Sequence, residues 1–356
     1  MKKLNIAVIG QGRSGRDIHG KYFKNEINTL YNVVAVAELD PERRERALVE
    51  YPGCVAVEDY REFYNMEGID LVLNSTYSEM HYEVTKDLLQ HKLNVLVEKP
   101  FARNYYECTD LIRIAKENGV VLAVFQQSFL TPYHQFTKKL IESGKLGDIL
   151  SVDVTFNGFS RRWDWQTLHC KMAGCTYNTG PHPVGLALDF LDFSPETNVV
   201  YSKMHNAMAS GDAEDWTRIV LTAPGKPFVE VQICPTDAFA DSFIKVQGTR
   251  GTYKCSASKY DLKYYSDDEN PAQPVIFESL KDAEGLPAYC SEELVTHEES
   301  GSFEGDGFNV AVSDFYEMLY NTIANGAELT ITPEMAAEII RIIEIAHGQN
   351  PMPTLY

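Results

Sequence analysis

The sequence predicts an α/β protein of two domains, an N-terminal doubly wound parallel sheet followed by a domain built on a mostly antiparallel sheet. Through about residue 125, short apolar runs alternate with helical segments, which is typical of parallel strands joined by crossover helices. Beyond residue 195 the apolar runs are separated only by short turns, which is typical of antiparallel strands. The 356 residues also exceed the roughly 250–300 at which a single core stops growing.

Charge and composition exclude several classes of partner. The chain has 32 Lys and Arg against 51 Asp and Glu, a net charge of -19. This charge would repel nucleic acid and anionic membrane surfaces, so we expect neither as a partner. Hydrophobic residues make up 44% of the chain, as in an ordinary soluble globular protein. No apolar run approaches the ~18 residues of a membrane helix.

The cysteines and the N-terminus indicate the compartment. The seven cysteines are odd in number and scattered, which is typical of reduced cytosolic thiols and not of a disulfide framework. Residues 4–9 are apolar, but this run is too short for a signal-peptide core and leads directly into a glycine motif. We therefore expect a cytoplasmic protein.

The glycine motif follows the first predicted strand, residues 4–9, and precedes a segment that can be helical through about Leu30. In this context G-x-G-x-x-G predicts a dinucleotide site. The first glycine permits a tight turn, the second lets backbone amides approach a pyrophosphate, and the third allows close packing of helix on strand. The motif reads Gly10-Gln11-Gly12-Arg13-Ser14-Gly15.

An acidic residue ends the second predicted strand, residues 32–37. Glu38 lies about 20 residues beyond Gly15, where such motifs place the acid that binds the ribose 2′-hydroxyl. A carboxylate there repels a 2′-phosphate, and the nearest cations, Arg43 and Arg44, lie beyond the helix-starting Pro41. The sequence therefore predicts NAD as the cofactor, in preference to NADP.

Further predicted strands cover residues 70–76, 95–99 and 120–125, with helical segments between them. The second of these ends in Glu98-Lys99-Pro100, where the proline ends strand pairing. The carboxyl ends of strands are where open α/β sheets place their chemistry. Partial burial beside a positively charged nicotinamide would lower the pKa of Lys99, which suits a proton acceptor or a hydrogen-bond donor.

The predicted elements place the domain boundary near residue 125, with a dinucleotide-binding domain at 1–125 and a substrate-binding and oligomerisation domain at 126–356. Residues 258–306 are polar and carry no clear pattern. The second part is expected to contain a short helix at 136–143, strands at 149–157, 198–205, 216–222, 228–234, 242–247 and 251–254, and helices at 308–325 and 333–347.

Five motifs resemble the glucose-fructose oxidoreductase, inositol dehydrogenase and rhizopine-catabolism (Gfo/Idh/MocA) family. The resemblance implies an N-terminal Rossmann domain, a C-terminal α/β domain with a large open sheet, a nicotinamide cofactor, sugar or polyol substrates, and a homodimer or homotetramer with open sheets in contact. The motifs are Gly10-x-Gly12-x-x-Gly15, Glu98-Lys99-Pro100, residues 140–147, Asn178-Thr-Gly180-Pro-His182 and residues 247–252.

The resemblance implies a catalytic group of Lys99, His182 and Asn178. Transfer of a hydride from an alcohol carbon leaves a proton that needs a positioned acceptor. His182 opens an apolar helix, and a helix N-terminus lowers the pKa of histidine and keeps it neutral. Asn178 replaces the Asp of many family members, so it can orient the histidine or bind a substrate hydroxyl but cannot stabilise imidazolium as a carboxylate would.

Two sets of binding residues are also expected. Aromatic faces with adjacent charges in residues 161–165 suit sugar rings, although the tryptophans could instead pack against the sheet. Substrate contacts are expected from Gln126, Arg161, Trp163, Trp165 and Asn178. Cofactor contacts are expected from Gly10, Gln11, Gly12, Arg13, Ser14, Gly15, Glu38, Ser75, Thr76, His81, Glu98 and Lys99.

A metal centre is not expected. The only cluster of soft ligands, His169, Cys170, Cys175 and His182, fits no zinc spacing, and the chemistry of the family needs no metal.

These expectations define a leading function and two alternatives. The first is an NAD-dependent dehydrogenase oxidising a secondary hydroxyl of a sugar, cyclitol such as inositol, or glycoside. The second uses tightly held NAD to oxidise a sugar carbon transiently, so that elimination or glycoside cleavage follows without net redox change. The third is a non-catalytic NAD-binding regulator, which the presence of Lys99 and His182 disfavours. Stoichiometric consumption of free NAD distinguishes the first from the second.

Overall fold

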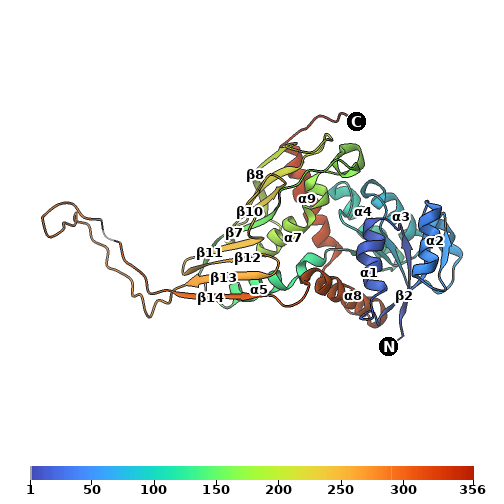
Figure 1. The fold of residues 1–356 in the computed structure, drawn as a ribbon, viewed down its shortest axis with the longest axis horizontal. Coiled ribbons are helices and arrows are strands. Elements are labelled where there is room, and N and C mark those ends of the chain that lie inside the picture. Colours follow the sequence, from blue (N-terminus) through green and yellow to red (C-terminus); the bar gives the residue numbers. More distant parts are fainter. Residues whose placement is uncertain (1, 290) are drawn as a thin grey trace.

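The computed structural model describes residues 2–289 and 291–356 and contains two sheets with helices between and around them (Figure 1). The first sheet is parallel, with the strand order β3-β2-β1-β4-β5-β6. This is the order of a Rossmann domain, so the predicted doubly wound sheet is confirmed. Its strands are β1 (Leu4–Ile9), β2 (Tyr31–Ala37), β3 (Val55–Val57), β4 (Leu71–Asn74), β5 (Val95–Val97) and β6 (Leu122–Val124).

Helices connect these strands, and their ends carry ordinary stop signals. Asp40 caps its helix by accepting from the backbone N–H of Glu42, with Pro41 in the first turn. Gly119 ends another helix at φ +66°, a conformation that favours glycine. The helices are α1 (Gly20–Phe23), which continues a π-helical segment Arg13–His19, and α2 (Pro41–Glu50), α3 (His81–Gln90) and α4 (Tyr105–Asn118).

The first helix is shorter than its sequence predicts. The pattern extends to about Leu30, but the helix ends at Phe23. The side-chain amide of Asn28 donates to the carbonyls of Phe23 and Tyr31, and its oxygen accepts from the N–H of Tyr31. A buried asparagine that satisfies backbone groups in this way stabilises a turn in place of further helix.

The second sheet has the strand order β14-β13-β12-β11-β7-β10-β9-β8. All of its pairs are antiparallel except β7 with β10, so the expected mostly antiparallel sheet is confirmed. Its strands are β7 (Ile149–Asn157), β8 (Asn198–His205), β9 (Trp216–Thr222), β10 (Phe228–Cys234), β11 (Ile244–Gly248), β12 (Gly251–Cys255), β13 (Lys259–Tyr264) and β14 (His297–Ser302).

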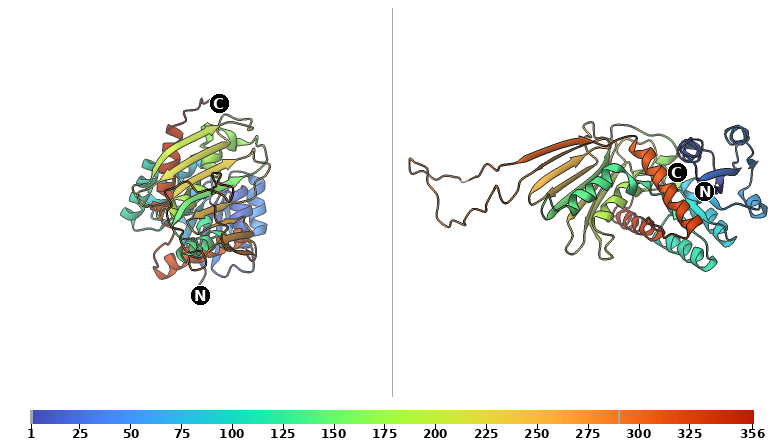
Figure 2. Two further views of the ribbon diagram at one scale, coloured as in Figure 1. Left: turned by 90° about the vertical axis from the view of Figure 1, so that its left-hand side faces the viewer. Right: turned by 90° about the horizontal axis from the view of Figure 1, so that it is seen from below.

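Helices cover one face of this sheet and connect it to the Rossmann domain. α7 (Pro181–Phe190) packs on β7 and β10, while α9 (Pro333–Gly348) packs on β8 and, on its other side, on α4. α5 (Pro132–Glu142) covers the same face near β12, where Thr137 contacts Tyr253. Within the described residues the opposite face carries no helix (Figure 2). We call it the open face.

The C-terminal part of the chain returns to the Rossmann domain. α8 (Gly307–Asn325) packs against α1, and Tyr316 lies fully buried there with its ring stacked on Tyr22 at 4.6 Å. The hydroxyl of Tyr31 donates to the carbonyl of Tyr316, and the hydroxyl of Tyr320 donates to the carbonyl of Lys2. The aromatic core of the first domain therefore includes residues from the end of the chain.

Shorter helical segments lie mainly in loops, and one long hairpin leaves the body. No helix in residues 2–289 and 291–356 is long and apolar enough to cross a bilayer. The hairpin connects β13 to β14, in the region that the sequence leaves unassigned (Figure 1). The short segments are α6 (Cys175–Asn178) and the 3₁₀ turns Tyr60–Asn65, Ser78–Met80, Gln127–Leu130, Trp165–Thr167 and His169–Lys171.

Candidate active site

The glycine motif forms a turn that is tightly packed on one side and open on the other. Gly10 has φ +89°, and a Cβ there would lie 2.6 Å from the carbonyl oxygen of Ser75. A Cβ on Gly15 would lie 2.0 Å from the carbonyl oxygen of Gly10. The nearest atom to a Cβ on Gly12 is 3.9 Å away, in the guanidinium of Arg43. This geometry fits a pyrophosphate that approaches the backbone beside Gly12.

Glu38 occupies the expected ribose edge, at the carboxyl end of β2. Its side chain is 9% exposed and accepts from the backbone N–H groups of Gln11 at 2.7 Å and Asp40 at 3.1 Å. Arg43 reaches back from α2 to within 3.7 Å of the carboxylate. The cation that the sequence placed beyond Pro41 therefore lies at the same edge as the acid.

We expect the protein to bind NAD more tightly than NADP, because Glu38 repels a 2′-phosphate. Glu38→Ala should narrow the difference about tenfold or more, a change of about 1.4 kcal/mol, since Arg43 becomes free to pair with the phosphate. Fluorescence titration with both dinucleotides measures this. Glu42→Ala, on an exposed position of the same helix, is the control. Equal or tighter binding of NADP by the unaltered protein would contradict the prediction.

Several other predicted cofactor residues lie around this turn. Arg13 is exposed, Ser14 is half-buried, and Gln11 is buried with its amide oxygen unpartnered among the described residues. Ser75 donates to the carbonyl of Ile9 at 2.7 Å and so holds β4 against the glycine turn. Ser75 therefore belongs to the packed side of the turn, against Gly10 and Gly15.

His81 joins two loops at the carboxyl end of the sheet. Its ring is buried, with Nδ1 2.7 Å from the carbonyl of Pro100 and Nε2 3.3 Å from the carbonyl of Thr76. Burial lowers the pKa of His81, so it is neutral and donates from one nitrogen only. The Thr76 hydroxyl in turn donates to the side chain of Asn74 at 2.7 Å. The contacts of His81 suit a residue that positions the Thr76 loop.

A buried network supports the strand end that carries Lys99. Glu98 is 3% exposed, and its carboxylate lies 2.9 Å from Nε2 of His19 and accepts from the backbone N–H of Lys99. The other ring nitrogen of His19 lies 2.7 Å from the hydroxyl of Tyr316. Burial is the largest single effect and would raise the pKa of Glu98, but the hydrogen bond and charge of His19, together with the charge of Lys99, outweigh it and lower that pKa to about 2. Glu98 is therefore ionised at neutral pH.

Lys99 reaches from the Rossmann domain to the second domain. Its ammonium nitrogen donates to the backbone carbonyl of Asn178 at 2.7 Å. Burial lowers the pKa of Lys99, an effect that the neighbouring Glu98 carboxylate offsets only in part. Asn178 thus meets Lys99 through its backbone, which leaves its side chain on the wall of the adjacent pocket.

His182 lies in the first turn of α7, next to Lys99. Its ring faces Phe156 at 6.4 Å, and its Nδ1 is buried with no hydrogen-bond partner in the described part of the chain. Burial, with the charge of Lys99 as the second cause, lowers the pKa of His182 to about 3. The structure therefore brings Lys99 close to a neutral imidazole whose Nδ1 has no partner among the described residues.

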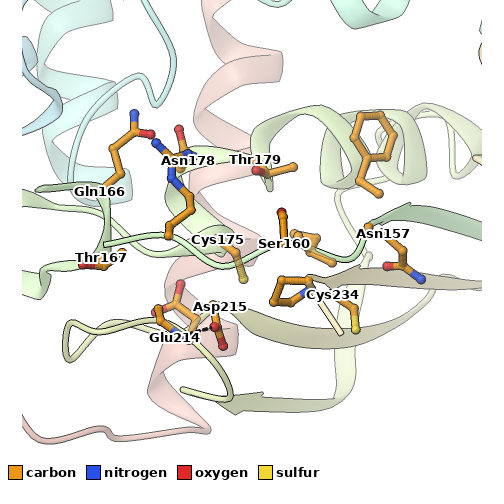
Figure 3. A pocket seen from close by; sticks show the side chains of 16 residues that line it. Asn157, Ser160, Gln166, Thr167, Cys175, Asn178, Thr179, Glu214, Asp215 and Cys234 are labelled. Carbon is orange, nitrogen blue, oxygen red and sulfur yellow. Dashed lines mark hydrogen bonds between the residues drawn. The ribbon is translucent and has the colours of Figure 1, made fainter. Parts of the chain in front are cut away.

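A pocket of about 270 Å³ lies beside this pair, in the second domain (Figure 3). Lys99 and His182 do not line the pocket themselves. Two lining residues contact them: Asn178, whose backbone carbonyl accepts from Lys99, and Phe156, whose ring faces that of His182. The pocket wall combines apolar side chains with hydroxyl, amide, guanidinium and carboxylate groups. The lining residues are Phe156, Asn157, Gly158, Ser160, Arg162, Gln166, Thr167, Cys175, Asn178, Thr179, Ala209, Glu214, Asp215, Ile233, Cys234 and Pro235.

One wall of the pocket is formed by a buried carboxylate that sequence reasoning missed. Glu214 accepts from the backbone N–H of Thr176 at 3.0 Å and lies 3.4 Å from the ring of His347. Burial would raise the pKa of Glu214, but the His347 pair outweighs it and lowers that pKa. A Cβ on Gly174 would lie 2.5 Å from this carboxylate. Glu214 and His347 are 133 positions apart in the chain, so no local pattern indicates their pairing.

The predicted substrate loop borders the pocket and contacts the Rossmann domain. Trp163 is 79% exposed and Arg161 is exposed, while Trp165 packs edge-on against Tyr77 of the Rossmann domain at 5.0 Å. Their neighbours Arg162 and Gln166 line the pocket. The predicted Gln126 is buried and donates to the carbonyl of Pro181 at 3.2 Å, which supports the helix turn that carries His182.

The described residues contain no group of three or more His, Cys, Asp or Glu side chains arranged to hold a metal ion. Cys175 lies 3.3 Å from the hydroxyl of Thr217, and burial raises its pKa well above the usual value. It is therefore a protonated thiol in the pocket wall.

Comparison with known proteins identifies the family. The model of an oxidoreductase family with an NAD-binding Rossmann fold matches residues 4–126, and the model of a GFO/IDH/MocA C-terminal domain matches residues 134–254. The chain belongs to the Gfo/Idh/MocA family of oxidoreductases. Its first domain is therefore an NAD-binding domain, as the glycine turn and Glu38 indicate.

Named relatives are distant in sequence but similar in length. Scyllo-inositol 2-dehydrogenase (NADP(+)) IolW of Bacillus subtilis is 24% identical, over 96% of this chain and 92% of that protein. A 2,7-anhydro-N-acetylneuraminate hydratase of Mediterraneibacter gnavus is 25% identical, over 71% of this chain and 67% of that protein.

Solved structures share the fold over nearly the whole chain. The oxidoreductase YhhX superposes with a TM-score of 0.78 at 22% identity, covering 99% of this chain and 98% of that one. GenD2 from gentamicin A biosynthesis, solved in complex with NAD, superposes with a TM-score of 0.77 at 19% identity, covering 98% of this chain and 94% of that one. The two-sheet architecture is thus that of known members of the family.

Proposed function

We propose that this oxidoreductase oxidises a secondary hydroxyl of a sugar, cyclitol or glycoside and transfers the hydride to NAD. The observation that carries the proposal is the neutral, unpartnered Nδ1 of His182 beside Lys99, within the described residues and next to a pocket. The two groups come from different domains, so the site exists only when both are folded. NAD, when bound, accepts the hydride.

The chain's own residues handle the proton. As the carbon–hydrogen bond breaks, the substrate oxygen must lose its proton to form the carbonyl. In this proposal Lys99 donates a hydrogen bond to that oxygen, which favours loss of the proton, and the neutral His182 accepts the proton. The Glu98 carboxylate beneath the Lys99 backbone maintains the geometry of the strand end.

The pocket suits a ligand with several hydroxyl groups. Arg162, Gln166 and the Asn178 side chain line it and offer donors and acceptors in a space for a small molecule. Trp165 and Tyr77 form an aromatic rim where the two domains meet. The names of the inositol dehydrogenase and anhydro-sialic acid hydratase relatives also support a cyclitol or sugar substrate.

The test is a substrate screen with purified protein. NADH formation should be followed by its absorbance against a panel of inositols, aldoses, uronic acids and glycosides. At least one polyhydroxylated compound should be oxidised with one NADH formed per molecule of product, and Lys99→Met should abolish that signal. Identical NADH formation by unaltered protein and Lys99→Met would overturn the proposed site.

A second candidate function is supported by the hydratase relative, because its name describes a hydration, which involves no net oxidation. In that case the protein would consume a glycoside or anhydro-sugar with only a catalytic amount of NAD, and no NADH would accumulate. Mass spectrometry of the same reactions distinguishes the two outcomes.

We also propose a cytoplasmic location and a homo-oligomeric state. The described cysteines are all free thiols, four of them buried, which is typical of a reducing compartment. These cysteines are Cys54, Cys108, Cys170, Cys175, Cys234 and Cys255. The open face of the second sheet, which no helix covers within the described residues, supports an oligomer.

A further inference from the structure

The hairpin between β13 and β14 is held by hydrogen bonds of its own. We call it the arm, meaning residues 266–289 and 291–296. At its base Asn270 is 9% exposed, donates to the carbonyls of Ser266 and Val295, and accepts from the N–H of Val295. At its tip Asp282 accepts from the N–H of Leu286, and Gly285 has φ +82°. The arm is therefore a hairpin pinned at both ends.

The arm exposes apolar side chains that its own body does not cover. Phe277 is 93% exposed and Tyr289 is fully exposed, and Val275, Ile276 and Leu286 are more than half exposed. Figures 1 and 2 show the arm extending away from both domains. An isolated two-stranded hairpin is marginally stable in water, and apolar groups gathered on one such segment mark an interaction site.

The direction of the arm points to what it contacts. It continues the β13–β14 pair, so it starts at one edge of the eight-stranded sheet. In Figure 1 it leaves on the side opposite the Rossmann domain, which is the side of the open face. A molecule seated on the open face would therefore lie beside the arm.

The composition of the open face follows from the strand register. Tyr253 pairs with Val246 and Leu262 on the neighbouring strands, and all three side chains are buried on the face that the helices cover. The residues before and after each of them along its strand therefore point to the open face. Applied across the sheet, this alternation gives six basic and four acidic outward side chains on a chain of net charge -19. They are Lys203, Arg218, Lys245, Lys254, Lys259 and Lys263, and Asp153, Glu230, Asp261 and Glu298.

The arm has the opposite charge. Residues 266–296 of the sequence contain eight acidic residues and one basic residue, Lys281. Four lysines of the open face, Lys245, Lys254, Lys259 and Lys263, lie on β11, β12 and β13, next to the edge from which the arm starts. The acidic arm of one copy is thus complementary in charge to the basic open face of a second copy, and the reverse contact is equally available.

We propose that the arm clasps a second copy of this chain, with its acidic side chains against the open-face lysines of that copy and its apolar tip packed on it. The contact is reciprocal, since each copy carries both elements. It adds to any contact between the open faces themselves.

The first test compares oligomeric mass by light scattering over a range of protein concentrations. In the shortened variant an Asn-Gly turn replaces residues 266–295, which suits a hairpin joining Tyr265 to Thr296. A second variant, Phe277→Ser with Tyr289→Ser, keeps the arm. Both should raise the dissociation concentration at least tenfold, whereas Leu39→Ser with Val49→Ser, exposed on the Rossmann domain, should not. A monomeric unaltered protein, or an unchanged mass for both arm variants, overturns the proposal.

The second test locates the contact. A carbodiimide, which joins carboxylates directly to amines, is applied to a mixture of isotopically heavy and light copies. Links between heavy and light peptides should join arm acids such as Glu278 and Glu284 to open-face lysines such as Lys245 and Lys254. The proposal would be overturned if the protein is oligomeric and every link between a heavy and a light peptide lies outside the arm.

Discussion

Replacing Lys99 by methionine or His182 by alanine is expected to lower kcat by about 10² to 10⁴-fold, roughly 3–5 kcal/mol of barrier. Each change removes one of the two groups proposed to act on the hydroxyl during hydride transfer, Lys99 as its hydrogen-bond donor and His182 as the acceptor of its proton. NAD affinity should change far less, because both changes leave the glycine turn and Glu38 intact and remove at most one of the expected cofactor contacts, that of Lys99. Steady-state kinetics with NAD titration measures both quantities.

The double variant tests whether the two residues act as one unit. We expect Lys99→Met with His182→Ala to be little slower than the poorer single variant. Lys171→Met is the matched control, because Lys171 also crosses between the domains, in an ion pair with Glu79 at 2.8 Å. Losses that multiply independently in the double variant would mean separate roles. Asn178→Asp adds a carboxylate near the pair and should move the pH optimum.

Replacing Glu98 by glutamine is expected to destabilise the protein by about 3 kcal/mol at neutral pH. The pKa of Glu98 is lowered to about 2, below its ordinary value near 4.5. A lowered pKa stabilises the folded state above the ordinary value, and this stabilisation is lost as the pH falls from about 4.5 toward 2. Urea unfolding at neutral and acidic pH should show that Glu98→Gln is less stable at neutral pH and loses less stability on acidification.

A surface pair provides the control for Glu98. Glu299 lies 2.8 Å from Lys145 and is 42% exposed, so Glu299→Gln should cost about 1 kcal/mol or less. Tyr316→Phe, which removes only the hydroxyl beside His19, provides a milder variant of the same network. An unfolding free energy and pH profile that are unchanged in both Glu98→Gln and Tyr316→Phe would refute the stabilising role of the network.

The Rossmann domain was predictable because its sheet is buried on both faces. Ile6, Leu71 and Leu96 are inaccessible to solvent, so their strands appear in the sequence as continuous apolar runs between helices. The places of Lys99 and His182 in the fold were predictable for a related reason, although their roles stay predictions. A proline adjoins each residue, after Lys99 at the strand end and before His182 at the helix start, and it marks that boundary without distant contacts.

The outer strands and the buried networks were not predictable in this way. β14 has the sequence His-Glu-Glu-Ser-Gly-Ser and little buried surface, so it carries no hydrophobic alternation. The Glu98–His19–Tyr316 network and the Glu214–His347 pair join residues far apart in the chain. The contact of Lys99 with Asn178 uses a backbone carbonyl, which every residue has. The identity of residue 178 therefore gives no indication of this contact.

The return of α8 to the Rossmann domain has a consequence for synthesis of the protein. The nucleotide-binding half leaves the ribosome first, but the place of Tyr316 beside Tyr22 and Phe125 stays empty until residue 316 has been translated. Until then the nascent chain exposes an aromatic surface and lacks one of the hydrogen-bond partners of His19. The first domain to be made is thus completed only when a helix from the far end of the second domain has been added to it.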